Sequence, residues 1–192
     1  MADIVALAKE ELEARGKADA AALAARAVSG EADGTELTAS QDTIPTWRQR
    51  DFSDVPVGTP YKWQGVVYKL WQQHDATGQP DWSPDKAVSL WDICHTTDPK
   101  LAGPYVQPQG TLGMYQPEDC CTENGHVWTC TQPNTVYPPS QLPASWEDLG
   151  TEEEIREACA CRGVRYWRPS KNIGSSSCWD CPPARWALPW PG

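Results

Sequence analysis

A short pattern of aromatic residues around a glycine occurs twice in this chain of 192 residues. The first copy runs from Tyr61 to Trp91, and the second copy runs from Tyr115 to Trp146. In each copy a glycine is followed closely by a valine and an aromatic residue, and a tryptophan ends the copy. Self-similarity of this kind is typical of a repeated folding unit. We therefore expect two small modules in tandem.

The two copies align through the residues that follow each glycine. The matched pairs are Gly65 with Gly125, Val67 with Val127, and Tyr68 with Trp128. The segments 83–91 and 138–146 align without a gap. The copies therefore differ mainly by about five additional residues in the first copy, around Thr77 to Trp82.

Strands are expected on both sides of each glycine turn. In the strand after the first turn, Tyr68 and Leu70 share one face, and Val67, Lys69 and Trp71 share the other. This alternation predicts a buried Tyr68 and an exposed Trp71. The aromatic residues that we expect in the cores of the two modules are Tyr68, Trp91, Trp128 and Trp146.

The N-terminal segment predicts a helix over residues 3–29. Asp3 can cap it, apolar residues recur at helical spacing from Ile4 to Leu12, and Gly16 is expected to end or bend it. The apolar stripe is narrow and rich in alanine, so it cannot bury much surface alone. The segment is therefore either a docking or self-association helix or a solvated leader.

The sequence predicts a mainly β fold with two modules, an N-terminal helix, a short C-terminal helix and an irregular tail. The expected units are a helical segment 1–30, a linker 31–43, the first module 44–92, a linker 93–110, the second module 111–149, and a short helix and tail 150–192. Thr151 and Glu154 form a capping box at the start of the short helix. The tail is rich in Cys, Trp and Pro and has no regular period.

Composition narrows the classes of partner. The net charge of −10 argues against nucleic acid, which requires clusters of Lys and Arg. No apolar stretch is long enough to cross a membrane, and the N-terminus lacks the features of a signal peptide. The 11 Trp and 6 Tyr against a single Phe favour partly wet aromatic surfaces, because Trp and Tyr carry a polar group.

The eight cysteines do not indicate a disulfide framework, because no signal peptide directs the chain to an oxidising compartment. One cross-strand bridge is plausible, between Cys120 or Cys121 and Cys130. Zinc is a further alternative for four thiols in the tail, although only one of the two pairs has the usual spacing. These thiols are Cys159, Cys161, Cys178 and Cys181.

The first copy resembles the carbohydrate-binding modules of families five and twelve, also called chitin-binding type 3 domains. The resemblance depends on the pattern Tyr61 to Trp71, His74, Trp82-Ser-Pro84 and Leu90-Trp91. The second copy resembles a degenerate member, and residues 44–149 are covered. The arrangement also resembles small proteins of bacteriophages and prophages, in which an N-terminal helix precedes such modules near tail-fibre genes.

The resemblance implies small, twisted three-stranded antiparallel sheets that stack exposed aromatic side chains on sugar rings. The family's stacking aromatics lie just after the matching tyrosine, near Trp71, and Trp82 follows in a polar loop. In the second module Thr131 occupies the position that corresponds to Trp71. Tyr137 is therefore the best candidate in that module. The full set of candidate binding residues is Trp71, Trp82, His74, Trp63 and Tyr137.

Catalysis is poorly supported by the sequence. Paired carboxylates on a rigid cleft and a nucleophile-elbow motif are both lacking, so hydrolase activity is suggested only by analogy with modules found on chitinases. We therefore expect a non-enzymatic protein that needs no cofactor and binds a chitin-like or cell-surface glycan, virion-associated or extracellular after release. The alternatives are a phage-tail assembly protein, which uses these modules or the N-terminal helix to contact proteins, and a small zinc-binding protein.

Overall fold

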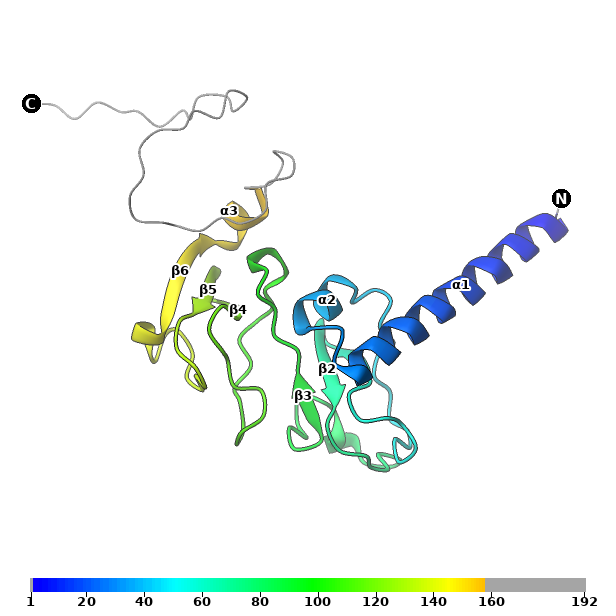
Figure 1. Ribbon diagram of the computed structural model, residues 1–192, viewed down its shortest axis with the longest axis horizontal. Coiled ribbons are helices and arrows are strands. Elements are labelled where there is room, and N and C mark those ends of the chain that lie inside the picture. Colours follow the sequence, from blue (N-terminus) through cyan, green and yellow to red (C-terminus); the bar gives the residue numbers. More distant parts are fainter. Residues whose placement is uncertain (1, 158–192) are drawn as a thin grey trace, which may run out of the picture.

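The computed structural model describes residues 2–157 and contains two three-stranded antiparallel sheets between an N-terminal helix and a short C-terminal helix. Figure 1 shows the two sheets side by side, with the N-terminal helix pointing away from the first of them. The predicted fold class is therefore confirmed. The tail and its four cysteines lie outside the described residues.

Helix α1 spans Ala2–Ser29 without interruption. It continues through Gly16 and is drawn without a kink, so the prediction that this glycine ends or bends the helix is wrong (Figure 1). One glycine in a helix interior costs only about 1 kcal/mol relative to alanine, and the flanking segments are rich in alanine, the best helix former. Local propensity therefore exceeds the cost of Gly16.

Only the C-terminal part of α1 packs on the rest of the molecule. Leu23 and Ala27 are buried together with Leu37 of α2 (Gly34–Ala39), with Ile44, and with Val67. Asp33 caps α2 by accepting a hydrogen bond from the backbone nitrogen of Glu36 at 2.7 Å. These contacts form a small core between the two N-terminal helices and the first sheet.

The first sheet contains β1 (Pro60–Trp63), β2 (Val66–Leu70) and β3 (Trp91–Ile93), in that spatial order. Tyr61 of β1 lies opposite Tyr68, and Leu70 lies opposite Trp91. Between β1 and β2, Gln64 and Gly65 both have positive φ, 49° and 83°. Two such residues form the tight turn whose twist matches a two-stranded ribbon.

The two faces of β2 are covered by different groups. Tyr68 and Leu70 are buried in an aromatic core with Phe52 and Trp91, as the alternation of side chains predicts. Val67 points to the other face and packs against the helical core of α1 and α2. The first sheet is thus covered on both faces.

The second sheet repeats this plan with β4 (Cys120–Glu123), β5 (His126–Cys130) and β6 (Trp146–Thr151). Cys121 lies opposite Trp128, the equivalent of the pair formed by Tyr61 and Tyr68. Asn124 and Gly125 form the turn, with φ of 54° and 79°.

The aromatic cores of the two modules are built from the same contact. Phe52 meets Trp91 edge-on with ring centroids 5.2 Å apart, and Tyr115 meets Trp146 at 5.1 Å. Tyr115 is therefore the counterpart of Phe52 in three dimensions. Trp128, which was expected in the core, is only partly buried and packs against the second cluster.

The segment expected as a linker, 93–110, is paired with the second module. Thr96 forms a bridge with Cys120, and Pro104 forms one with Thr122. The backbone nitrogen of Gly113 also donates a 3.0 Å hydrogen bond to Asp92 of the first module. These contacts connect the two modules directly.

Short helices complete the described chain. The 3₁₀ turns are Pro80–Trp82, Pro99–Leu101 and Pro143–Ser145, and α3 spans Glu152–Glu157. The capping box is formed, because the backbone nitrogen of Thr151 donates to Glu154 at 2.9 Å and the backbone nitrogen of Glu154 donates to Thr151 Oγ1 at 3.2 Å.

Cys94, Cys120, Cys121 and Cys130 are all free thiols. The register places Cys120 opposite Thr129 and Cys121 opposite Trp128, so neither is the direct cross-strand partner of Cys130. The plausible bridge to Cys130 is therefore not formed. Across residues 2–157, no helix has both the length and the apolar character needed to cross a membrane.

Candidate functional site

Three aromatic side chains of the two modules are exposed although nearby aromatic residues are buried. The exposed fractions are 52% for Trp71, 36% for Trp82 and 52% for Tyr137. All three were predicted as binding residues. Large exposed rings offer flat apolar surface that a ligand can cover, so these rings are the first candidates for a binding surface.

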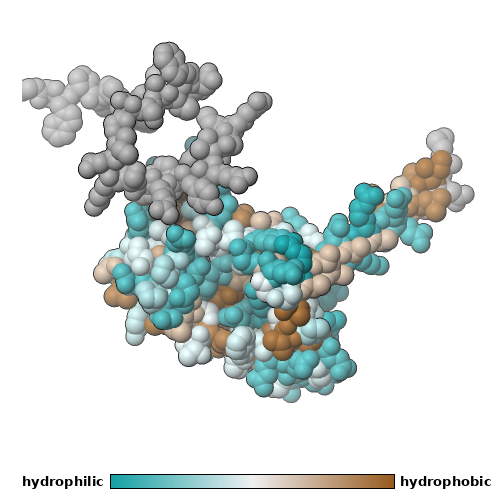
Figure 2. Space-filling model, in the orientation of Figure 1, coloured by the Kyte–Doolittle hydropathy of each residue, from teal (hydrophilic) through white to brown (hydrophobic). Residues whose placement is uncertain are grey.

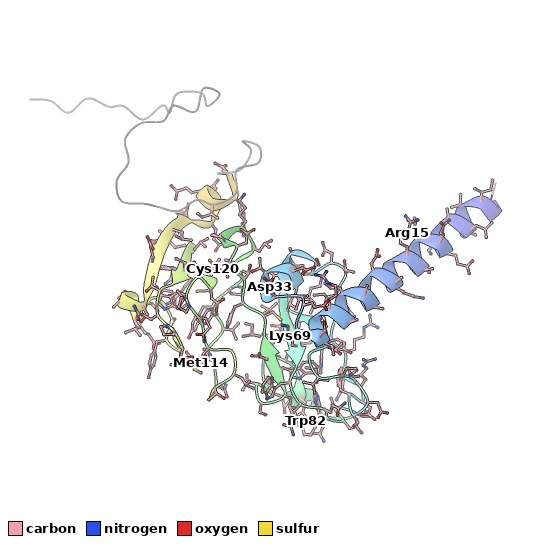
Figure 3. All side chains as sticks on the ribbon, viewed as in Figure 1. Arg15, Asp33, Lys69, Trp82, Met114 and Cys120 are labelled. Atoms are coloured by element: carbon pink, nitrogen blue, oxygen red, sulfur yellow. The ribbon has the colours of Figure 1, made fainter. Side chains whose placement is uncertain are left out.

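Trp82 lies at the end of the 3₁₀ turn Pro80–Trp82 and is labelled in Figure 3, at the end of the first module remote from α3. Its carbonyl oxygen accepts a 3.3 Å hydrogen bond from the indole nitrogen of Trp91. Lys86 forms a 2.8 Å ion pair with Asp81 across the same turn. The backbone of Trp82 is thus fixed while its ring remains exposed.

Trp71 follows directly after β2. Its backbone nitrogen donates a 2.9 Å hydrogen bond to the carbonyl oxygen of Leu90, and the nitrogen of Gln72 donates to the same oxygen at 3.2 Å. The position is therefore held by the sheet, while the side chain extends into solvent. Trp71 and Trp82 both meet the requirement of a binding group on a rigid support.

His74 is buried, in contrast to the two tryptophans. Its ring lies 5.4 Å from that of Trp91 and 5.7 Å from that of Trp82, both edge-on. Nδ1 lies 2.7 Å from the carbonyl oxygen of Gln72, and Nε2 has no hydrogen-bond partner. Since a carbonyl oxygen only accepts, Nδ1 carries a proton and donates this hydrogen bond. His74 thus supports the ring of Trp82 from the protein interior.

Trp63 is half-buried and its polar group is already satisfied. The indole nitrogen donates a 2.8 Å hydrogen bond to Asp85, and the ring meets Trp47 edge-on at 5.0 Å. Asp85 also accepts from the hydroxyl of Ser83. Burial, followed by the charge of Asp85, raises the pKa of Tyr68 to about 12. The hydrogen bonds from Trp63 and Ser83 to Asp85 thus hold these polar groups in place at the surface of the first module.

Tyr137 is the structural counterpart of Trp82. Its carbonyl oxygen accepts a 3.0 Å hydrogen bond from the indole nitrogen of Trp146, as that of Trp82 does from Trp91. In the sequence, Trp82 and Tyr137 directly precede the segments 83–91 and 138–146, which align without a gap. The alignment therefore pairs the two residues, but the sequence-based prediction treated them separately.

The second module lacks the other exposed ring. The backbone nitrogen of Thr131 donates a 2.9 Å hydrogen bond to the carbonyl oxygen of Ser145. The backbone nitrogen of Trp71 donates to the carbonyl oxygen of Leu90 in the same way. The backbone position is thus retained, but the side chain is a threonine. The first module presents two exposed rings at matched positions and the second presents one.

Within residues 2–157 no group of three or more His, Cys, Asp or Glu side chains is arranged to hold a metal ion. The chain matches no protein-family model, and a search of curated proteins finds no match.

Proposed function

We propose that this protein binds a carbohydrate polymer without catalysis, through the exposed rings of Trp71 and Trp82. The observation that carries the proposal is the combination of exposed indoles with a hydrogen-bonded backbone in one small module. The resemblance of this module to chitin-binding type 3 domains favours a chitin-like or cell-surface glycan.

Stacking on a sugar explains why these groups are tryptophans. One face of a pyranose presents C–H groups, and the flat indole face carries negative charge density that attracts them. Because the supporting backbone is fixed before binding, little conformational entropy is lost when the sugar arrives. Nearby polar groups such as Asp85 and Lys86 can then hydrogen-bond to hydroxyl groups.

Tyr137 extends the proposal to the second module. A polymer repeats the same sugar many times, so a weak second contact on the same chain increases the overall affinity. A single ring binds less strongly than two, so we expect the second module to assist the first. Glycan polymers of this kind lie on cell surfaces, and the proposed place of action is extracellular or virion-associated.

The test is retention of the purified protein on insoluble chitin and on bacterial cell walls. Trp71→Ala and Trp82→Ala are each expected to weaken binding about tenfold or more, which corresponds to about 1.4 kcal/mol. Val57→Ala is a matched control, because Val57 is also an exposed apolar residue that precedes the first sheet. It should leave retention unchanged.

Two results would contradict the proposal. Wild-type protein that is not retained on any glycan tested would contradict it outright. Equal losses of retention in Val57→Ala and Trp71→Ala would show that retention depends on nonspecific adsorption through apolar surface. In both cases the assembly alternative, in which the same surface contacts protein, would gain support.

A further inference from the structure

Helix α1 extends far beyond the core that holds it. Residues 4–19 are all exposed, and Figure 1 shows this part of the helix projecting from the first module. Ile4 and Leu7 leave 71% and 64% of their surface exposed. Figure 2 shows the apolar atoms gathered at the free end and paler atoms along the shaft. Isolated helices are only marginally stable in water. We therefore expect a partner helix to cover the exposed apolar residues of this projecting shaft of α1.

One line of residues along this shaft has the spacing of a coiled-coil interface. Intervals of three and four residues alternate along it, as at the a and d positions of a heptad repeat. We call this line the seam, and it consists of Ile4, Leu7, Glu11, Ala14, Ala18 and Ala21. At 3.6 residues per turn, the seam lies on the side of α1 opposite Leu23 and Ala27, which pack on the body. All seam residues are exposed.

The sizes of the seam residues indicate the direction of a partner helix. The large residues lie at the N-terminal end, and the alanines lie toward the body. Two parallel copies would place large against large and small against small, which forces the helix axes apart at one end. Two antiparallel copies place Ile4 against the partner's Ala21 and Leu7 against the partner's Ala18. Large then meets small in each layer, and the axes keep one separation.

The charges beside the seam favour the same direction. Glu10 and Lys17 lie on one flank, and neither forms an ion pair within residues 2–157. In the antiparallel arrangement Glu10 faces the partner's Lys17, and by symmetry this pair occurs twice. Parallel helices would instead place Glu11 directly against the partner's Glu11, a like-charge contact.

Glu11 is accommodated within the helix when the partner is antiparallel. It faces the partner's Ala14, and Arg15 of the same helix lies 3.9 Å away. Figure 3 labels Arg15 on the projecting part of α1. The charge of Glu11 is thus balanced locally and does not require a partner across the interface.

We propose that two copies of this chain associate through an antiparallel pairing of their α1 helices along the seam. The interface is isologous, so each surface meets its own equivalent and the assembly closes at two subunits. The bodies lie at opposite ends of the helix pair and on its outer sides, since Leu23 and Ala27 point away from the seam. This association does not depend on the proposed glycan binding.

The first experiment measures the mass of the full chain by analytical ultracentrifugation over a range of concentrations, under reducing conditions. Wild-type protein is expected to approach twice its chain mass of 21.2 kDa as concentration rises. Ala18→Glu places a charge in the seam and should leave the protein monomeric. Ala6→Glu makes the same change on exposed helix surface outside the seam and should behave as wild type.

The second experiment tests the direction of pairing. Lys17→Glu and Glu10→Lys each convert two attractive pairs into repulsive ones, and each should raise the dimer dissociation constant about tenfold. An equimolar mixture of these two variants restores both pairs and should associate as wild type does. Arg15→Glu should weaken association less than Lys17→Glu, because Arg15 faces the partner's Ala8 in this arrangement and its replacement removes only the local balance of Glu11.

Each contrary result overturns the proposal. A wild-type chain that stays monomeric at all concentrations shows that the shaft has no partner of its own kind. Equal behaviour of Ala18→Glu and Ala6→Glu shows that association uses another surface. Sensitivity to Arg15→Glu with indifference to Lys17→Glu shows parallel helices, in which Glu10 would face the partner's Arg15.

Discussion

The indole nitrogen of Trp91 donates a hydrogen bond to the carbonyl oxygen of Trp82, nine residues earlier in the chain. Trp146 forms the same bond with Tyr137. In each module a buried tryptophan therefore holds the backbone of an exposed aromatic residue, Trp82 in the first and Tyr137 in the second. In each module one hydrogen bond thus links the buried core to the candidate binding surface.

Trp91→Phe tests this coupling, because it keeps an aromatic ring and removes the donor. The loss of the hydrogen bond and of ring volume is expected to lower the free energy of unfolding by about 2–3 kcal/mol. Urea denaturation measures this change. Retention on glycan should also fall for the fraction that remains folded. Unchanged retention per folded molecule would show that the bond does not position Trp82.

The turn at Gln64 offers a stabilising substitution. Gln64 adopts a positive φ of 49°, a conformation that Asn tolerates better than Gln, and the second module uses Asn124 at the matched position. Gln64→Asn should therefore raise the free energy of unfolding by about 0.5 kcal/mol. Asn124→Gln should lower it by a similar amount. Opposite signs in thermal denaturation are the expected result, and a loss in both variants would contradict this account.

The raised pKa of Asp92 should make the free energy of unfolding depend on pH. Burial is the main cause that raises its pKa, opposed by the hydrogen bond from Gly113 and by the charges of His95 and Lys69. The charged form is therefore costly in the folded state, and this cost is fully present above the native pKa. As pH falls through the native pKa, the folded carboxyl takes up a proton before the unfolded one, and the cost is lost.

Asp92→Asn removes the charge and keeps an oxygen that can accept from Gly113. The variant should be more stable than wild type near neutral pH, and the difference should vanish by about pH 3, below both pKa values. Denaturation curves at several pH values measure the difference. A gain that persists unchanged at low pH would show that packing, not charge, is the cause.

The internal thiols are expected to be unreactive in the native protein. Burial raises the pKa of Cys94 to about 12 and that of Cys120 to about 12. Because the thiolate is the nucleophile, alkylation near pH 8 should be about a thousandfold slower than in urea. Peptide mapping after iodoacetamide treatment distinguishes these cysteines from those of the tail. Equal rates in native and denatured protein would contradict their burial.

Features encoded by neighbouring residues could be predicted from the sequence. The glycine turns, the alternation that buries Tyr68 and exposes Trp71, and the burial of Trp91 and Trp146 follow from local period and turn chemistry. These signals lie within a few residues of one another, so a single sequence contains them completely.

Features that depend on distant segments could not be predicted. The cover over Val67 comes from Leu23 of α1, and no pattern near either residue indicates the contact. The pairing of Pro104 with Thr122 uses irregular backbone and therefore leaves no hydrophobic period. His74 is buried because Phe52 and Trp91 surround it, and both come from other parts of the module.

The contact between Val67 and the C-terminal part of α1 has a mechanical consequence. Val67 is next to Tyr68 in the strand that ends immediately before Trp71, so the helix and the exposed indole share one stiff support. The 28 residues of α1 extend about 42 Å at 1.5 Å per residue. Whatever binds the free end of α1 therefore also orients the first module and the direction in which Trp71 faces.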